Sequence, residues 1–290
     1  MNFISNCLYG IFVAYLQGKE REKLITRGDA ATYANYLLHE KNVSHKTLHR
    51  NISVLVTYWE YLISIGEVNT NIFRSIVSKF ENKPIVPTKV LVSDQVKKIF
   101  LLSENSHLDQ TIFTILFYTG MRVGELVSLK RNSYVMEEEF GKKHWVLKYV
   151  AKRDKVVKKV LNDKFVNVIN DYLDYMNEIG REVLASDPLL QPSRNFFRED
   201  GTLALNRPIS VSYIKRIFKK YFKKIDISEM RGYSAHSART TLITTLIEKG
   251  CDIYAVSKEM GHNDVATTQR CYDRSRRKLA DSLLLEKDIY

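Results

Sequence analysis

The sequence predicts a mainly helical α+β protein with one small antiparallel β-sheet, divided into two domains. Apolar residues recur at three- and four-residue steps through most of the chain, whereas residues 133–161 contain short alternating or β-branched runs typical of strands. The segment 78–90 contains two prolines and little periodicity, which is typical of a linker. Because 290 residues suffice for two cores, we expect domains at residues 1–85 and 86–290.

The composition favours an intracellular protein with a polyanionic partner. The chain has 45 Lys and Arg against 33 Asp and Glu, a net charge of +12, and each phosphate that such a surface neutralises releases counterions. The apolar run from Phe3 to Leu16 is interrupted by polar residues and is too short to span a bilayer, so we expect an amphipathic helix in a cytoplasmic protein. The three cysteines have neither disulfide nor metal-site spacing, and we expect no metal or other cofactor.

The first domain is predicted to be all helical, and residues 46–65 give its clearest helix. Ser44 is suited to cap the start of this helix, and Gly66 is suited to end it. The polar face of the helix includes Lys46 and Arg50. These side chains are either part of a solvated surface or contacts to DNA.

The second domain is predicted to combine helices with a three-stranded meander. We expect helices at 94–102, 111–118, 123–129, 164–180 and 211–222, and strands at 133–136, 144–150 and 156–161. Ser93 is suited to cap the first of these helices. The last of them is strongly basic, and its Lys215 and Arg216 are consistent both with solubility and with DNA contact.

The stretch from His236 to Tyr272 carries side chains suited to phosphate chemistry. His236 and Arg239 are three residues apart, a spacing that places an imidazole and a guanidinium on one face of a helix, where they can hold one anion. A second imidazole, His262, lies ten residues before Tyr272. Together these groups suggest a phosphodiester that is held for attack by a tyrosine oxygen.

Turn signals place these side chains at the ends of helices. Gly261 can form a sharp turn after an apolar helix at 253–260, and Asn263 or Asp264 can cap a new helix at 265–269.

More charged groups fit the same chemistry. Arg122 lies between two predicted helices, and Glu125 can hold its guanidinium in a bidentate pair. Around Tyr272, Arg270 and Arg274 favour DNA contact over a merely solvated basic run.

Five short motifs, TGMRVGEL, AKRDK, HSAR, MGH and RCY, occur in this order and together resemble the catalytic signature of the tyrosine recombinases, the integrase family that includes phage integrases and Xer-type resolvases. The resemblance covers about residues 89–290, and the helical first domain is similar to the core-binding domain of that family. It implies site-specific cutting and rejoining of DNA through a 3′-phosphotyrosyl intermediate, without ATP or metal. A type IB-like topoisomerase and a non-catalytic DNA-binding protein with this fold are the alternatives.

The resemblance implies which residues bind the phosphate. Arg122 and Arg239 match the two arginines that hold the non-bridging oxygens, and His262 matches a histidine that hydrogen-bonds the phosphate. Glu125 matches the acidic position that supports the first arginine.

The resemblance also implies which residues move protons and attack. Tyr272 matches the nucleophile, and His236 matches the histidine that manages its proton. Lys152 matches the hairpin lysine that protonates the departing 5′ oxygen. Lys155 is its alternative and is also expected to contact DNA. The family usually has GKGxK at this hairpin, so AKRDK implies a tip of different shape or mobility.

The implied partners are double-stranded DNA with a specific recombination site and further copies of the same chain. In this family a C-terminal tail packs into a neighbouring protomer and links the active sites of a tetramer. The leucines after Tyr272 form a narrow apolar stripe that is too short to be stable alone. We therefore expect the tail of this chain to be exchanged in trans.

Overall fold

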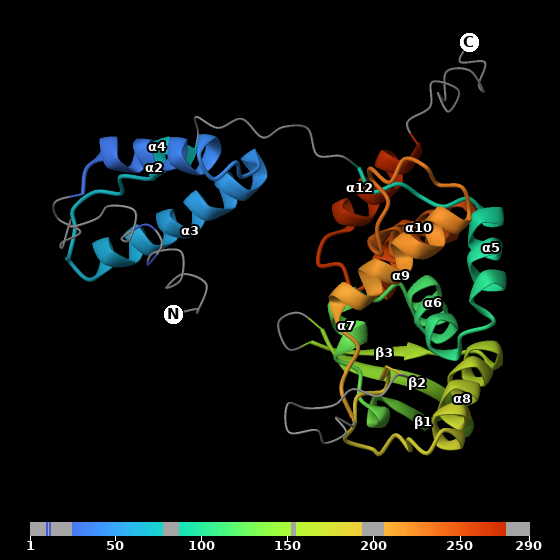
Figure 1. The fold of residues 1–290 in the computed structure, drawn as a ribbon. Coiled ribbons are helices and arrows are strands. Elements are labelled where there is room, and N and C mark those ends of the chain that lie inside the picture. The colour runs from blue at the N-terminus through green and yellow to red at the C-terminus, as the bar shows by residue number, and fades with distance from the viewer. Residues whose placement is uncertain are drawn as a thin grey trace, which may run out of the picture. The chain divides into compact units, whose positions relative to one another are not determined.

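The computed structural model describes residues 10, 12, 25–77, 87–151, 155–192 and 206–276 (Figure 1). The chain divides into two compact units, Met1–Ile85 and Val86–Tyr290. Most of the helix expected near the N-terminus, most of the expected linker, Lys152 and the tail expected to be exchanged lie outside the described residues. None of the described helices is both long and apolar enough to cross a membrane.

The first unit is helical, as the sequence predicts, with α2 (Arg27–His39), α3 (His45–Ser64) and α4 (Arg74–Val77). The hydroxyl of Ser44 accepts a hydrogen bond from the Thr47 amide and caps α3, and Gly66 follows the helix with φ 77°. Edge-to-face ring contacts among Trp59, Phe12 and Phe73 lie at the centre of its core.

The second unit combines eight described helices with one sheet, which confirms the mainly helical α+β prediction. The helices are α5 (Ser93–Ser103), α6 (His107–Thr119), α7 (Val123–Val127), α8 (Asp163–Glu178), α9 (Val211–Lys224), α10 (His236–Glu248), α11 (Ile253–Glu259) and α12 (Val265–Arg276). The N-cap of α5 is Val92, and Ser93 is already its first helical residue, so the expectation that Ser93 caps this helix is wrong. The start of α6 lies four residues earlier than expected because Ser106 caps it.

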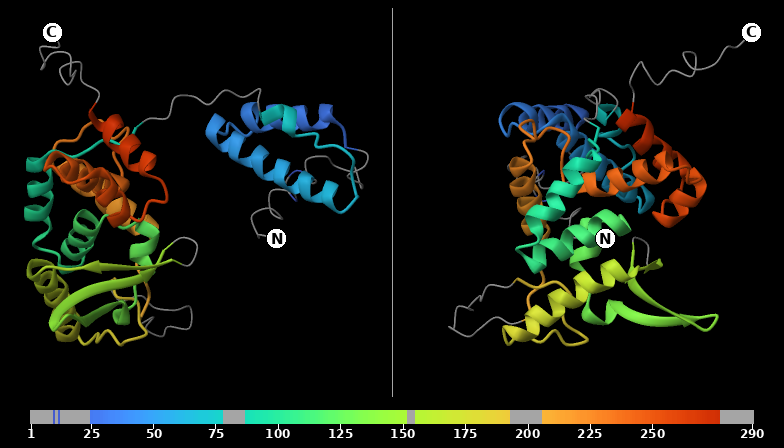
Figure 2. Two further views of the ribbon diagram at one scale, coloured as in Figure 1. Left: turned by 180° about the vertical axis from the view of Figure 1, so that it is seen from behind. Right: turned by 90° about the vertical axis from the view of Figure 1, so that its right-hand side faces the viewer.

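The sheet is the predicted meander, with β1 (Tyr134–Glu139), β2 (Lys142–Val150) and β3 (Val156–Val160) in antiparallel order β1-β2-β3. It lies with α8 at one end of the unit, and α12 lies at the other, with α6, α9 and α10 between them (Figures 1 and 2). The buried face of β2 carries Leu147, which is fully buried. Lys159 of β3 contacts Glu259 at the end of α11, so this arrangement brings β3 close to the helices that follow residue 235 in the sequence.

The segment before α5 is fixed to the loop that precedes α10. The Lys89 amide donates a hydrogen bond of 2.9 Å to the carbonyl oxygen of Gly232. Gly232 has φ 88°, and a Cβ there would lie 2.9 Å from the carbonyl oxygen of Pro87, so this close approach requires glycine. The Leu91 amide donates to the hydroxyl of Thr241 at 3.0 Å. Residues 87–91 therefore lie against the start of α10.

Candidate active site

Arg122 is held at the start of α7 by Glu125. One carboxylate oxygen of Glu125 accepts from Nη1 of Arg122 at 2.7 Å, and the other accepts from the Arg122 backbone amide at 2.7 Å. The expected bidentate pair between the carboxylate and the guanidinium is therefore wrong, because the second oxygen is used to cap the helix. The guanidinium remains half-exposed, while Glu125 is buried, so Arg122 has donors left for a ligand.

Arg239 is buried on α10 and bonded to two backbone carbonyls. Nη1 donates to the carbonyl oxygen of Gly120, and Nη2 donates to the carbonyl oxygen of Met260 at 2.6 Å. Gly120 lies two residues before Arg122, and Met260 lies two residues before His262. A single guanidinium thus connects the turns that carry two other predicted site residues.

His236 is the first residue of α10, and its side chain is exposed at the end of the helix. Partial loss of hydration, followed by the positive charges of Arg239 and Arg122, lowers the pKa of the imidazole. The ring is therefore biased towards its neutral form, which can accept a proton.

His262 follows the C-terminal turn of α11, which Gly261 closes with φ 65°. Its Nδ1 lies 2.7 Å from the hydroxyl oxygen of Thr268, which is fully buried on α12. Burial, then Arg239, Arg122 and His236, lower the pKa of His262 to about 4. A neutral ring with one nitrogen fixed by Thr268 leaves Nε2 for a ligand.

Tyr272 is half-buried on α12, which extends to residue 276 and not only to residue 269 as expected. Asp264 accepts from the Ala266 amide at 3.0 Å at the start of this helix. Thr268 and Tyr272 are four residues apart, so they lie on one face of α12. The helix face that contacts His262 is therefore also the face that carries the tyrosine.

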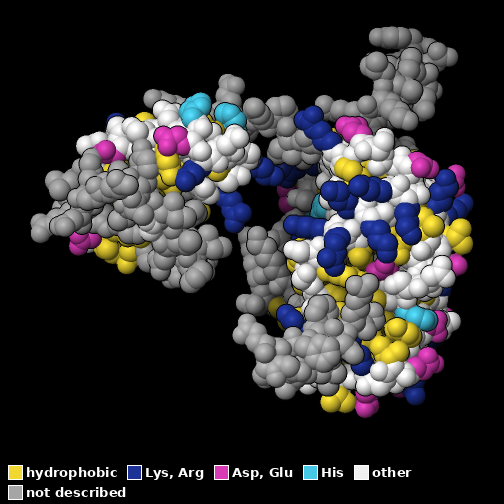
Figure 3. All heavy atoms as spheres, in the orientation of Figure 1, with side chains coloured by type: hydrophobic (Ala, Val, Ile, Leu, Met, Phe, Trp, Pro, Cys, Tyr) yellow, Lys and Arg dark blue, Asp and Glu magenta, His cyan; other side chains and the backbone are white. Residues whose placement is uncertain are grey.

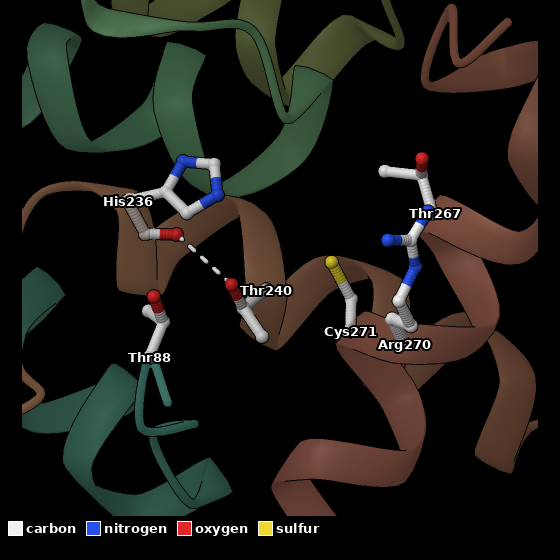
Figure 4. Close-up of a pocket in the computed structure, with 6 residues that line it drawn as sticks. All are labelled: Thr88, His236, Thr240, Thr267, Arg270 and Cys271. Atoms are coloured by element: carbon white, nitrogen blue, oxygen red, sulfur yellow. Dashed lines mark hydrogen bonds between the residues drawn. The ribbon is translucent and has the colours of Figure 1, made fainter. Parts of the chain in front are cut away.

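A pocket of about 220 Å³ lies beside His236, between α10 and α12 (Figure 4). His236 and Thr240 line it from α10, with Thr88 from the segment before α5. The α12 residues that line it are Thr267, Arg270 and Cys271. Cys271 also packs against the small apolar cluster that contains Met260.

The basic residues predicted to contact DNA are exposed wherever their side chains are described. These are Lys46 and Arg50 on α3, Lys155 before β3, Lys215 and Arg216 on α9, and Arg270 on α12. The backbone of Arg274 belongs to α12, but its side chain lies outside the described residues. Lys and Arg side chains gather on one face of the second unit, over the region in which Figure 1 draws α9 and α10 (Figure 3).

The structure thus brings Arg122 and Arg239 close enough to His236 and His262 for the two positive charges to lower the pKa of both imidazoles. Lys152 lies outside the described residues, so its predicted place stays a prediction. Sequence reasoning missed Thr268. Its sequence signal is its position one helical turn before Tyr272. The contact of Thr268 with His262 is visible only in the structure.

Comparisons with known proteins agree on one family. The sequence profile described as the phage integrase family matches residues 89–278. A "TnP I resolvase" from Bacillus thuringiensis is 27% identical over 273 residues, covering 89% of this chain and 83% of the relative. "Tyrosine recombinase XerC" from Thermodesulfovibrio yellowstonii is 27% identical over 235 residues, covering 79% of this chain and 71% of the relative.

Solved structures give the same fold. A lambda integrase fragment solved as a dimer bound to a core site matches with a TM-score of 0.66 at 18% identity, over 96% of this chain and 91% of that one. The integrase of the transposon Tn1549, solved with transposon end DNA, matches with a TM-score of 0.64 at 19% identity, over 99% of this chain and 93% of that one.

Proposed function

The chain belongs to the phage integrase family and is a tyrosine recombinase that acts in site-specific DNA recombination, and we propose which of its residues cut and rejoin DNA. Tyr272 is the nucleophile, and Arg122, Arg239 and His262 bind the phosphate that it attacks. His236 and Lys152 move the protons.

The observation that carries this proposal is the connection that Arg239 makes between two turns. Because its guanidinium donates to Gly120 and Met260, the positions of Arg122 and His262 depend on the same buried group. Donors fixed in this way stabilise the charge that develops on the non-bridging oxygens without having to reorganise during the reaction.

The reaction is a transesterification that needs no external energy source. The Tyr272 oxygen forms a bond to phosphorus, the bond from phosphorus to the 5′ oxygen breaks, and the DNA 3′ end becomes linked to the protein. The tyrosine proton goes to His236, whose lowered pKa favours the neutral, proton-accepting ring. Lys152 supplies the proton that converts the departing oxygen into a free 5′ hydroxyl, and Lys155 is the alternative donor. Attack by a 5′ hydroxyl of a second strand reverses these steps.

The remaining basic residues provide the DNA surface. On the second unit these are Lys215 and Arg216 of α9, with Arg270 and Arg274 of α12, while Lys46 and Arg50 give the first unit a contact of its own. A first unit that clamps DNA and a second that cuts it account for the two units of the chain. None of these side chains is buried where it is described, which leaves them available to phosphates.

Recombination joins two DNA sites, so the chain works as an assembly of several copies on DNA. A lambda integrase solved as a tetramer on a Holliday junction has this fold at 19% identity, with a TM-score of 0.64. We include in the proposal that the tail after residue 276 is exchanged between neighbouring copies.

The test of the nucleophile is covalent capture of DNA. The wild-type chain and Tyr272→Phe are incubated with nicked suicide duplexes drawn from the DNA around its own gene, with EDTA present, and protein–DNA adducts are resolved on denaturing gels. We expect a 3′-linked adduct with the wild type and none with Tyr272→Phe. Tyr254→Phe is the matched control, since Tyr254 is an exposed tyrosine of α11, and it should form the adduct. An adduct that persists in Tyr272→Phe would assign the nucleophile elsewhere.

A further inference from the structure

Strand β3 buries a lysine where the alternation of a strand calls for an apolar side chain. Lys159 pairs with Leu147 of β2, so both side chains lie on the face of the sheet that is turned to the core. Lys159 is 4% exposed, whereas its neighbour Val160 is 67% exposed and Val156 is 55% exposed. The strand therefore places valines in solvent and a charge inside, which demands an explanation because lysines are almost never fully buried without a partner.

The partner of Lys159 lies a hundred residues away, at the end of α11. Its Nζ donates to a carboxylate oxygen of Glu259 at 2.7 Å and also to the backbone carbonyl oxygen of Glu259. A cation at this place satisfies a carbonyl that the helix leaves without an intrahelical partner. Lys159 thus connects the β-sheet of the second unit to the last turn of α11.

That last turn leads directly into two groups of the proposed active site. The residue after Glu259 is Met260, whose carbonyl oxygen accepts from Arg239 at 2.6 Å. The His262 amide then donates to the carbonyl oxygen of Ser257 at 3.0 Å, which closes the turn. A shift of the end of α11 would therefore move His262 and an acceptor of Arg239 together.

We propose that Lys159 is a positioning residue for DNA cleavage, which holds the turn Met260–His262 in a fixed position relative to the sheet. This inference rests on the proposed function. Lys159 does not contact the DNA itself, because its side chain is 5% exposed and its ammonium is occupied by Glu259. A purely stabilising role explains less, because the Glu259 side chain is 61% exposed and an ion pair that is open to water contributes only about 0–1 kcal/mol to stability.

The first test separates positioning from stability. Lys159→Met keeps the length and the burial of the side chain but removes its charge. We expect its single-turnover cleavage rate at saturating DNA to fall about 10- to 100-fold, as small misplacements of catalytic groups do, with Tm and the Kd for DNA unchanged. Lys158→Met is the matched control, since the neighbouring Lys158 is half-exposed and bonds to Glu137 of β1 at 2.6 Å. It should cleave at the wild-type rate, and a wild-type rate in Lys159→Met would overturn the proposal.

A second variant keeps the test valid if Lys159→Met unfolds. The Glu259 side chain is 61% exposed, so Glu259→Gln should fold normally. It weakens the contact without removing the backbone acceptor, and we expect a measurable loss of about two- to tenfold in the same rate. A wild-type rate in Glu259→Gln, together with an Lys159→Met protein that does not fold, would overturn positioning and leave only stabilisation.

The leaving group identifies the part of the site that Lys159 serves. A substrate whose 5′ bridging oxygen is replaced by sulfur has a leaving group that needs no protonation. On this substrate the defect of Lys159→Met should persist, because Arg239 and His262 act on the phosphate. A defect that disappears would overturn the proposal by showing that Lys159 serves proton donation at the β2–β3 hairpin instead. The wild-type chain on the same substrates reports separately on the proposed function, which fails if no adduct forms at all.

Discussion

The guanidinium of Arg239 donates a hydrogen bond of 2.6 Å to the carbonyl oxygen of Met260, from one helix of the second unit to the end of another. The same group also donates to the carbonyl oxygen of Gly120. Arg239 is therefore both a buried structural connection and the proposed clamp for the phosphate. Its geometry explains why a planar group with several fixed donors occupies this position.

Replacement of Arg239 by lysine should abolish most of the cleavage. One ammonium cannot reproduce two carbonyl contacts in a fixed plane and still face a phosphate. We expect the single-turnover rate of adduct formation to fall about 10²- to 10³-fold, as for loss of one preorganised donor. Arg231→Lys changes an exposed arginine in the loop before α10 and should retain the rate. An Arg239→Lys rate within a few-fold of wild type would contradict the clamp.

Gly120→Ala should destabilise the second unit and lower its cleavage rate. Gly120 has φ 62°, and a Cβ there would lie 2.7 Å from Sδ of Met260, so the substitution adds backbone strain and displaces a buried side chain. We expect a loss of about 1–3 kcal/mol in the free energy of unfolding, measured by urea denaturation. Gly124→Ala provides the comparison, because a Cβ there meets no atom within 4 Å on helix α7. It should be neutral or stabilising by up to about 1 kcal/mol, and equal losses in both variants would contradict this account.

Much of the fold could be predicted because its signals are local. The cap of α3 at Ser44, the glycine that follows that helix and the β2–β3 hairpin are each decided by residues within a few positions of one another. The start of α6 was missed although Ser106 is also a local cap. The reason is that the residues directly after Ser106 have less regular apolar periodicity than the core of the helix.

The site was predicted only in part because several of its contacts join residues that are far apart in the sequence. The spacing of His236 and Arg239 is visible in the sequence, whereas the carbonyl partners of Arg239 come from two distant turns. The same holds for Lys159. In the sequence it is one more basic residue of a polar strand, and only the folded structure shows its contact with Glu259 of α11. No pattern within β3 distinguishes its buried lysine from its exposed one.

The stability of the free protein should fall as the pH falls from about 6.5 to 4. The folded chain holds the pKa of His262 at about 4, below its ordinary value near 6.5, so the unfolded chain binds a proton that the folded chain does not. The stabilisation linked to the neutral ring is therefore complete above about pH 6.5 and is lost towards pH 4. His236, whose pKa is also lowered, acts in the same direction.

His262→Gln should flatten this pH dependence. Between pH 7 and pH 4.5 the wild type should lose about 1–2 kcal/mol more unfolding free energy than the variant, less than the full linkage because the ring is partly exposed. Urea denaturation at four pH values measures the difference. Parallel curves for the two proteins would show that His262 does not titrate with a depressed pKa.

The exposed face of α9 should contribute to DNA affinity in a salt-dependent manner. The hydroxyls of Tyr213 and Tyr221 both donate to the buried carboxylate of Asp109, at 3.1 and 2.9 Å, and this fixes the rotation of α9. Lys215 and Arg216 consequently face solvent, and Arg216 lies 5.4 Å from the centre of the Tyr213 ring. A rigid helix that presents cations in this way is suited to contact phosphates of a duplex.

Lys215→Ala should weaken DNA binding uniformly across sequences if Lys215 neutralises a phosphate. The slope of log K against log salt should then decrease in magnitude by about 0.9, because one fewer counterion is released. Lys143→Ala is the matched control, since Lys143 is an exposed lysine near the β1–β2 turn that we do not place on DNA. Fluorescence anisotropy over about 50–300 mM salt measures the slopes of both variants and of the wild type. Equal slopes for Lys215→Ala and the wild type would remove α9 from the DNA surface, while equal changes in both variants would reduce the effect to net charge.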